Sequence, residues 1–312
     1  MKICVIICNP QSGKINKEKL LFKFKKILWD YGYKTEIKYT KKSKDAINII
    51  KSLPKVDLVI AAGGDGTLNE VLNGNLSRKE KLLIANLPLG TTNDVGKMYG
   101  YTKNYCKDLK MLLSGIIKNI DTCKINDKGF VYVSCFGNYV DIAYNTPRKL
   151  KKTLGKAAYF LRGFKEATNR VKTYGLNYKV NGIESYGNYS FIFITNSSSV
   201  GGIKNFVPNV KLDDNAFEVI FCKLTNKFDI IKSLIYIIAG KIHKAKGIEY
   251  YKTDKLEIVF DDQDIAWCVD GEEYKLGTNK YNFSINKDIN MLVPYKHINN
   301  LFEKGDDDGT KF

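Results

Sequence analysis

A glycine-rich turn is the part of the sequence best suited to chemistry. The stretch AAGGDGTLNEVLNG, residues 61–74, holds three glycines within four positions, with Asp65 between them. A strand running through Gly64 into a helix presents backbone N–H groups at the helix start, where the helix dipole favours a phosphate. Glycines let the backbone approach such an anion closely. An acid there makes sense if Mg²⁺ stands between Asp65 and the phosphates, and Thr67 is expected to cap the helix while reaching a phosphate oxygen.

Known glycine-loop patterns do not describe this turn. The Walker pattern G-x-x-x-x-G-K-[ST] is absent, because Ser12-Gly13-Lys14 lacks both the earlier glycine and the following hydroxyl. The dinucleotide pattern G-x-G-x-x-G, started at Gly64, fails at Asn69. A plain strand-to-helix turn therefore stays open as an alternative.

Two further segments carry acids. Val269-Asp270-Gly271-Glu272 offers two acids around a glycine, and Lys211–Ala216 reads KLDDNA. On their own these segments favour structural interpretations, an Asp-Gly hairpin turn and an Asx-type turn, and Asp121 reads as a strand-end aspartate.

The composition is that of a globular protein with a basic balance. The 312 residues suffice for two domains of about 150 residues each. Fifty basic against thirty-three acidic residues give +17, which predicts attraction to nucleic acid, a membrane surface or phosphorylated small molecules. Seven cysteines without a CxxC pair indicate reduced thiols in a cytosolic protein, and two histidines outside any motif argue against histidine triads and zinc hydrolase sites.

The order of apolar segments predicts an α/β domain followed by an all-β domain. Over residues 1–125, short apolar runs alternate with helical patterns, which indicates a doubly wound parallel sheet. We expect strands at 2–8, 34–40, 56–63 and 82–88, and helices at 17–31, 43–53, 67–74 and 104–115. Over 126–290, short β-branched and aromatic runs indicate a β-sandwich with helical inserts at 147–172 and 227–242. The polar tail 304–312 is expected to be disordered.

The sequence resembles the diacylglycerol kinase catalytic family, specifically its small soluble bacterial lipid kinases. GGDGTLNEVLNG at 63–74 matches the family signature at nearly every position. The segments that agree with the family in order and spacing are 9–14, 90–100, 196–219 and 269–274. The resemblance implies a phosphofructokinase- or NAD kinase-like α/β domain, a β-sandwich lipid-substrate domain, and a return of the chain to the first domain near 290–303.

The resemblance implies an ATP site at the carboxyl ends of the predicted strands, the edge at which open α/β sheets bind ligands. The implied nucleotide-binding residues are Asn9, Pro10, Gln11, Ser12, Gly13, Thr40, Gly64, Asp65, Gly66, Thr67, Leu68, Asn69, Glu70 and Thr91.

The resemblance also gives the acids of the second half their roles. Glu272 matches the family's catalytic base, Asp270 is expected in the same acidic network, and Asp65 helps to place the Mg²⁺-nucleotide. Glu273 faces the opposite side if this segment is a strand.

A second Mg²⁺ site is implied around Lys211–Ala216. Its ligands would be the carboxylate of Asp214 and the carbonyls of Lys211 and Ala216, with Asp121 linked to them. The chain departs from the family at three positions. Asn215 stands where glycine is usual, and asparagine also tolerates left-handed geometry. Val95 replaces an aromatic residue, and Lys97 replaces an arginine and cannot make a bidentate contact with a phosphate.

The predicted function is an ATP- and Mg²⁺-dependent kinase that phosphorylates a lipid alcohol, most simply diacylglycerol, to give phosphatidate. The alternatives are an NAD kinase, a basic nucleic-acid- or membrane-binding protein without activity, and a silent lipid-sensing relative. No RNP, KH or helix-turn-helix pattern appears, so no nucleic-acid partner is expected.

A lipid acceptor would explain the excess of basic residues in the chain. Residues 148–172 form a basic amphipathic pattern suited to an anionic membrane surface, or a packed helix with a solvated basic face. We expect a cytoplasmic protein peripherally associated with the inner face of the membrane. No stretch approaches the ~18 apolar residues of a spanning helix. The resemblance implies exposed β-edges that could support a homodimer.

Overall fold

The structure is a computed structural model. It describes residues 1–13, 16–137, 171–200, 206–226, 241–262 and 265–303, with single positions between 227 and 240. The predicted basic helix at 148–172 lies outside the described residues except for Val171 and Lys172. Most of the insert at 227–242 and all of the tail 304–312 also lie outside them. The chain forms two compact units: unit 1 comprises Met1–Thr122, Lys211–Asp214 and Asn286–Phe312, and unit 2 comprises Cys123–Val210 and Asn215–Ile285.

Unit 1 is built on a parallel sheet. Its strands run in the order β2 (Tyr33–Tyr39), β1 (Lys2–Cys8), β3 (Leu58–Gly63) and β4 (Ile84–Pro88), and every neighbouring pair is parallel. Residues 4–8 of β1 and all of β3 are buried. Such continuous apolar runs are typical of strands covered by helices on both faces.

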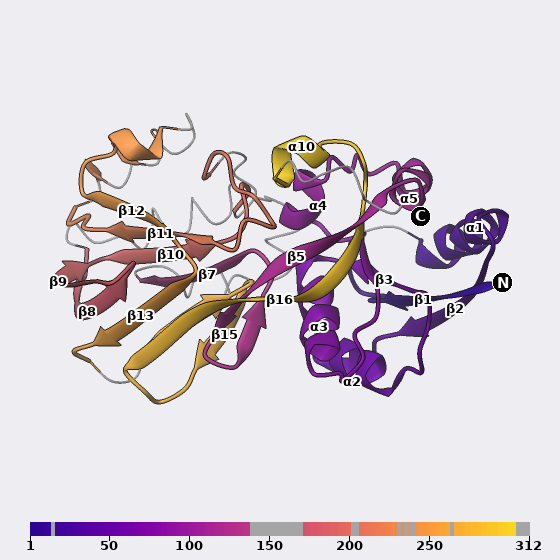
Figure 1. The fold of residues 1–312 in the computed structure, drawn as a ribbon, viewed down its shortest axis with the longest axis horizontal. Coiled ribbons are helices and arrows are strands. Elements are labelled where there is room, and N and C mark those ends of the chain that lie inside the picture. The colour runs from indigo at the N-terminus through magenta and orange to yellow at the C-terminus, as the bar shows by residue number, and fades with distance from the viewer. Residues whose placement is uncertain are drawn as a thin grey trace. The chain divides into compact units, whose positions relative to one another are not determined.

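Helices cover both faces of this sheet (Figure 1). α1 (Lys17–Asp30) packs with α5 (Tyr105–Leu113) on one face, and α2 (Asp45–Ser52) packs with α3 (Asp65–Leu76) on the other. The short α4 (Asp94–Met98) follows β4, and α10 (Ile298–Leu301) comes late in the chain. α1 begins where the side chain of Asn16 accepts a hydrogen bond from the Lys19 N–H, and its buried Leu21, Phe24 and Leu28 share one face at helical spacing. The predicted doubly wound domain is confirmed.

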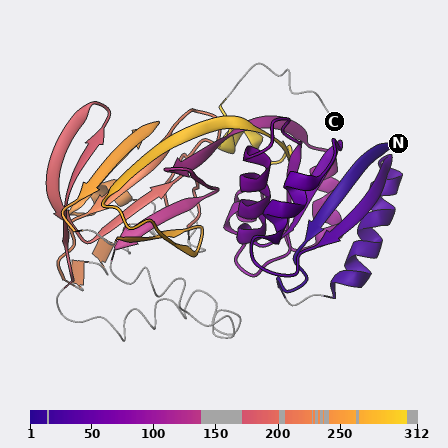
Figure 2. The ribbon, with the colours of Figure 1, turned by 90° about the horizontal axis from the view of Figure 1, so that it is seen from below.

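Unit 2 is a sandwich of antiparallel strands, seen from a second direction in Figure 2. One sheet contains the unit 2 part of β16 (Lys280–Val293), β13 (Lys255–Phe260), β8 (Tyr174–Val180) and β9 (Ile183–Tyr189). The other has the order β12 (Ile248–Thr253), β11 (Phe217–Cys222), β10 (Phe191–Thr195), β7 (Val133–Gly137), β14 (Ala266–Val269) and β15 (Glu272–Lys275). β5 (Ile116–Ile125) pairs with β16 and β6 (Lys128–Phe130), and a 3-10 turn spans Ile242–Lys244. The predicted β-sandwich is confirmed.

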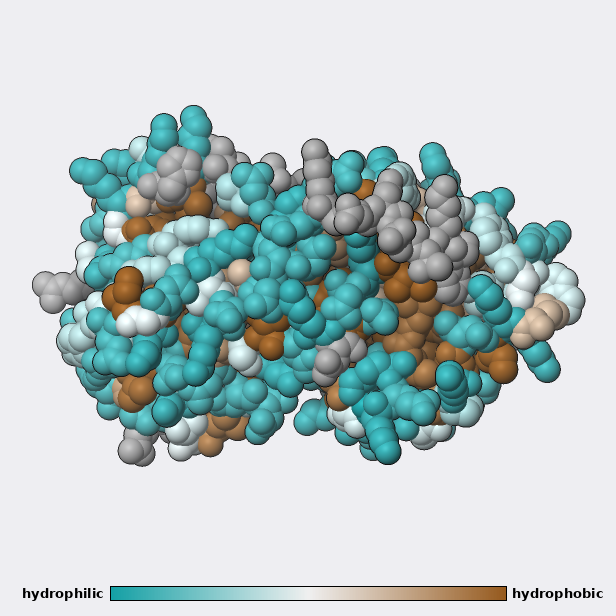
Figure 3. Space-filling view, in the orientation of Figure 1, coloured by the Kyte–Doolittle hydropathy of each residue, from teal (hydrophilic) through white to brown (hydrophobic). Residues whose placement is uncertain are grey.

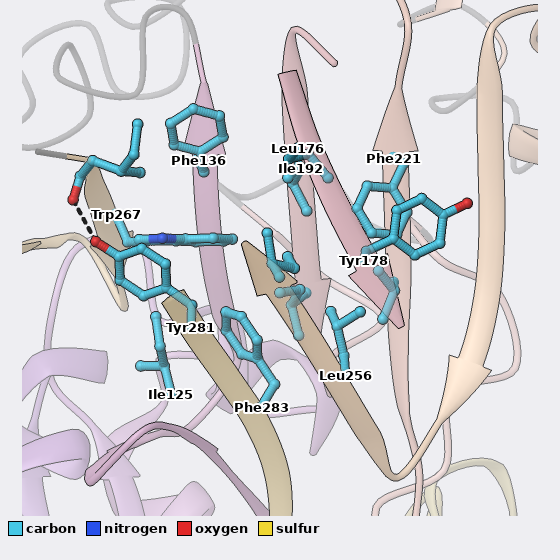
Figure 4. Close-up of a cluster of buried hydrophobic side chains, with 14 of the residues drawn as sticks. Ile125, Phe136, Leu176, Tyr178, Ile192, Phe221, Leu256, Trp267, Tyr281 and Phe283 are labelled. Carbon is cyan, nitrogen blue, oxygen red and sulfur yellow. Dashed lines mark hydrogen bonds between the residues drawn. The ribbon is translucent and has the colours of Figure 1, made fainter. Parts of the chain in front are cut away.

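The core of unit 2 is rich in aromatic side chains from both sheets (Figure 4). Trp267 of β14 packs on Tyr281 and Phe283 of β16, with ring centroids 5.6 Å and 5.1 Å apart. The Tyr281 hydroxyl donates to the Ile265 carbonyl at 2.7 Å, so its polar end is satisfied. The face seen in Figure 3 is mostly hydrophilic over the described residues, with hydrophobic residues in separate patches.

A polar network also joins the two sheets. Glu249 of β12 accepts the hydroxyls of Tyr178 on β8 at 3.2 Å and Tyr189 on β9 at 2.9 Å, and Lys223 pairs with it at 2.5 Å. Burial opposes ionisation of Glu249, but the hydrogen bonds from Lys223 and the two tyrosines outweigh it, so the pKa of Glu249 lies below its ordinary value. The charged form of Glu249 therefore stabilises the sandwich.

Asp121, whose local interpretation was a strand-end aspartate, lies inside β5, and β16 continues to Val293. The extension of β16 pairs Met291 and Leu292 with the edge of β4, a long-range contact that local patterning does not encode. Among the described residues, no helix combines the length and apolar character needed to cross a bilayer.

Candidate active site

The turns that follow four strands of unit 1 meet at one edge of its sheet. Each is tied by its backbone to a neighbouring strand end: Asn9 donates to Ala62 at 3.2 Å, Thr40 to Cys8 at 3.0 Å, and Gly90 to Gly63 at 3.0 Å. These are the carboxyl ends of parallel strands, where open α/β sheets bind ligands. The structure thus brings together the four segments that were predicted to bind nucleotide.

Close backbone contacts explain several glycines at this edge. Gly13 has φ +66°, and a Cβ on it would lie 2.3 Å from the Leu89 carbonyl oxygen. A Cβ on Gly90 would lie 2.6 Å from the Cα of Gly64. A Cβ on Gly66, in contrast, would meet nothing within 4 Å. Protein packing therefore accounts for Gly13 and Gly90, whereas Gly66 faces open space.

The predicted capping role of Thr67 is wrong. α3 begins at Asp65, two residues before the predicted start, and its N-cap is Gly64 without a side-chain cap bond. Thr67 is buried in the first turn, where its backbone N–H donates to the Gly64 carbonyl at 3.0 Å and its side chain fills the space beside Gly63. Because the cap residue Gly64 has no side chain to bind them, the first N–H groups of α3 are suited to an anion.

Asp65 connects the glycine turn to the start of α4. Its Oδ2 accepts the N–H of Asp94 at 2.9 Å and its Oδ1 accepts the N–H of Val95 at 3.2 Å. Asp94 is itself buried and pairs with Lys97 at 2.9 Å. Asp65 therefore fixes the relative position of two helix starts, and its predicted metal role stays a prediction.

Other predicted nucleotide residues have structural contacts of their own. The carboxylate of Glu70 accepts the N–H groups of Lys44 at 2.9 Å and Ala46 at 3.1 Å, at the start of α2. Leu68 is fully buried, and Asn69 accepts a hydrogen bond from Asn73 at 3.1 Å. Their contribution to nucleotide binding stays a prediction.

The loop at 9–13 is organised by its own polar groups and by a lysine. Asn9 Oδ1 accepts the N–H of Gln11 at 2.9 Å, and the Ser12 hydroxyl donates to the Asn9 carbonyl at 3.0 Å. The ammonium of Lys17 donates to the carbonyls of Pro10, at 2.9 Å, and of Ser12. After β2 and β4, Thr40 is buried and Thr91 is exposed.

Two acids predicted for the second metal site, Asp121 and Asp214, belong to unit 1. The N–H of Asp121 donates to the Leu212 carbonyl at 2.7 Å, which brings Asp121 beside the segment Lys211–Asp214. The Asp121 carboxylate lies 3.7 Å from the Lys287 ammonium, and Asp214 Oδ2 is buried. Asn215 adopts φ +60°, the left-handed geometry expected of it. In the described part of the chain, no group of three or more His, Cys, Asp or Glu side chains is arranged to hold a metal ion, and the predicted Mg²⁺ site stays a prediction.

In unit 2, Asp270 lies in a tight hairpin turn and Glu272 directly follows that turn. Asp270 and Gly271 have φ +50° and +88°, as a two-residue turn between β14 and β15 requires. The Asp270 carboxylate accepts the N–H groups of residues 131, 132 and 133 at 2.7, 3.1 and 3.0 Å, so it anchors the hairpin to the chain before β7. Glu272 and Glu273 lie opposite Val269 and Cys268 and face opposite sides of the ribbon, with Glu272 exposed.

Comparisons with known proteins agree with this architecture. Residues 3–125 match the diacylglycerol kinase catalytic domain, and residues 139–284 match the YegS C-terminal NAD kinase beta sandwich-like domain. A diacylglycerol kinase of Bacillus subtilis (strain 168) is 30% identical over 261 residues, 83% of this chain and 86% of the relative. A diacylglycerol kinase of Staphylococcus aureus (strain JH9) is 31% identical over 305 residues, 95% of each chain.

The chain belongs to the diacylglycerol kinase family. A crystal structure from Bacillus anthracis str. Sterne, of a protein assigned to the diacylglycerol kinases, has a TM-score of 0.78 at 25% identity and covers 94% of this chain and 96% of its own. A second structure from that strain, of a diacylglycerol kinase, shares the fold with a TM-score of 0.70 at 21% identity over the same shares of the chains. The resemblance read from the sequence is confirmed.

Membership in a kinase family implies that ATP is the phosphoryl donor, and binding of ATP at the edge described above stays a prediction. Sequence reasoning missed two residues there, Lys17 and Asp94. A lysine at the first position of a helix opposes the helix dipole, and that conflict is the signal that could have identified Lys17. The contact of Asp94 with Asp65 joins residues 29 positions apart and has no local signal.

Proposed function

We propose that this protein is an ATP- and Mg²⁺-dependent lipid kinase that transfers the γ-phosphoryl group to the hydroxyl of diacylglycerol and forms phosphatidate. The observation that carries the proposal is the uncapped start of α3 at Gly64–Asp65, set among three other turns at the carboxyl edge of a parallel sheet. Relatives named diacylglycerol kinase that align over most of this chain support the choice of acceptor.

In this proposal the residues of unit 1 bind and orient the nucleotide. The N–H groups at the start of α3 and in the loop Asn9–Gly13 bind phosphate oxygens, and Gly66 leaves room for them. Asp65 keeps the start of α4 against that of α3, so both turns hold their geometry as the phosphates bind. When bound, Mg²⁺ neutralises charge that develops on the phosphate oxygens.

The donor set around Lys211–Ala216 fits Mg²⁺, because this ion prefers carboxylate and carbonyl oxygens. Asp214, with a buried carboxylate oxygen, and the carbonyls of Lys211 and Ala216 would hold it, and Asp121 would lie beside them.

In unit 2, Glu272 accepts the proton of the lipid hydroxyl. A general base must reach the reacting group, and Glu272 is exposed on a hairpin that Asp270 anchors through three backbone hydrogen bonds. Asp270 thus acts as a positioning residue for Glu272. The proton leaves the hydroxyl as the new phosphate ester bond forms, while the bond from the γ-phosphorus to the bridging oxygen breaks and ADP leaves.

A lipid acceptor requires contact with a membrane surface, and the net charge of +17 favours an anionic one. We propose peripheral, salt-sensitive binding to anionic vesicles, measured by co-sedimentation with and without added salt. We also propose a homodimer formed through edge strands such as β9, measured by light scattering on the full chain.

Transfer of label from γ-labelled ATP tests the function. The full chain is incubated with Mg²⁺ and either diacylglycerol in mixed micelles or NAD, because unit 2 also resembles the NAD kinase sandwich. We expect labelled phosphatidate, no labelled NADP, and loss of product when Mg²⁺ is chelated. Labelled NADP without labelled lipid would overturn the choice of acceptor.

A further inference from the structure

Lys17 occupies a place that is unfavourable for a lysine. It is the first residue of α1, at the positive end of the helix dipole, and only 8% of it is exposed. Lysines are almost never buried unless their charge is met by acceptors. The helix start does not need it, because Asn16 caps α1. The burial of Lys17 therefore serves something other than the helix.

The ammonium of Lys17 binds the loop that follows β1. It donates to the carbonyl of Pro10 at 2.9 Å and to the carbonyl of Ser12. Hydrogen bonds from a charged donor are stronger than neutral ones, so two of them on one short loop fix its shape. The carbonyls of Pro10 and Ser12 therefore point toward this ammonium.

This arrangement sets the direction of the loop's N–H groups. The Ser12–Gly13 peptide is trans, so its N–H points away from the side on which its carbonyl meets Lys17. Gly13 then packs against the Leu89 carbonyl in the turn after β4, with its φ of +66°. Lys17 thereby directs the positive end of this peptide dipole away from α1, at the carboxyl edge of the sheet.

We propose that Lys17 is a positioning residue for ATP: by binding the carbonyls of Pro10 and Ser12, it holds the loop Asn9–Gly13 in the shape that binds the nucleotide phosphates. This inference rests on the proposed function, since it takes ATP as the ligand of the loop. Lys17 acts through the loop and not on the reacting atoms, so it affects ATP binding more than the rate of transfer.

The test is Lys17→Met, which keeps the length of the side chain and removes its donors. We expect the KM for ATP to rise about tenfold, because a tenfold loss of affinity corresponds to the loss of about one charge-assisted hydrogen bond. The kcat and the KM for diacylglycerol should stay within about twofold of the wild type. Lys17→Arg, which keeps charge and donors, should restore most of the ATP affinity.

Lys81 provides a matched control. Its ammonium also donates to two backbone carbonyls, those of Leu76 at 2.9 Å and of Arg78, but at the far end of α3. Lys81→Met should lower the melting temperature as Lys17→Met does and leave the KM for ATP unchanged. An equal rise in KM for both variants would overturn the proposal, because the effect would then be general loosening.

Different results would refute the role of Lys17 and the proposed function. If the wild type transfers no phosphate from ATP to lipid, the proposed function fails. If the wild type is active and Lys17→Met has the wild-type KM for ATP, the role of Lys17 is refuted. If Lys17→Met and the milder Lys17→Gln both fail to fold while Lys81→Met folds, Lys17 holds the fold and the positioning role is refuted as well.

Discussion

Replacing Gly66 by alanine tests whether this glycine is required for the stability of the fold or for the binding of ATP. Gly66 is the second residue of α3, its φ lies outside the left-handed region, and a Cβ there would meet nothing within 4 Å. Nothing in the protein itself thus requires glycine. In a helix, alanine is favoured over glycine by about 0.5–1 kcal/mol, so Gly66→Ala should raise the melting temperature by about 1–3 °C.

The same methyl group should weaken nucleotide binding. It would stand at the start of α3, in the space that the phosphates are proposed to occupy, and would keep them from the N–H groups of the first turn. Loss of one charge-assisted hydrogen bond is worth about 1.5–3 kcal/mol, so the KM for ATP should rise at least about tenfold. Stability and ATP affinity should therefore change in opposite directions.

The assay combines a melting curve with the KM for ATP. Gly90→Ala is the contrasting variant, since its Cβ would lie 2.6 Å from the Cα of Gly64 and must destabilise the protein with or without ligand. A Gly66→Ala protein that melts higher and keeps the wild-type KM for ATP would refute the phosphate site at α3.

Three further predictions concern unit 2. Glu272→Gln should lower kcat at least about 100-fold while the melting temperature stays unchanged, because Glu272 is exposed; kinetics and a melting curve on one sample check this. Asp270→Ala should lower the free energy of urea unfolding by at least about 2 kcal/mol, since the buried N–H groups of residues 132 and 133 lose their acceptor at a cost of about 1–3 kcal/mol each. The pKa of Glu249 is lowered on folding, against burial, by Lys223 and the tyrosines, so its contribution is present above its ordinary pKa of 4.5 and is lost as pH falls through the folded value. The urea midpoint should fall between pH 6 and pH 3 less steeply for Glu249→Gln than for the wild type; equal slopes would contradict this.

Local pattern and turn chemistry predicted most of unit 1. β1 has the bounds expected from KICVIIC, because the buried apolar run forms the strand and Asn9-Pro10 ends it. The start of α3 was misplaced by two residues, since threonine is the better cap by type but Gly64 takes that position to let Thr67 fill the space beside Gly63. Tertiary packing thus overrode a local preference.

The site's polar contacts were less predictable because most of them are long-range. The Asp270-Gly271 hairpin follows from local turn chemistry, but the three N–H groups that bind Asp270 come from residues 137–139 positions earlier. Glu70 likewise binds backbone groups 24 and 26 residues away. A carboxylate that anchors structure and one that binds a ligand look alike in sequence, and only the fold separates them.

The most direct measurement is a crystal structure of the full chain with ATP and Mg²⁺. The phosphates should lie within hydrogen-bonding distance of the backbone N–H groups at the start of α3, with Gly66 against them. A nucleotide bound elsewhere, with that helix start in contact only with water, would contradict the account.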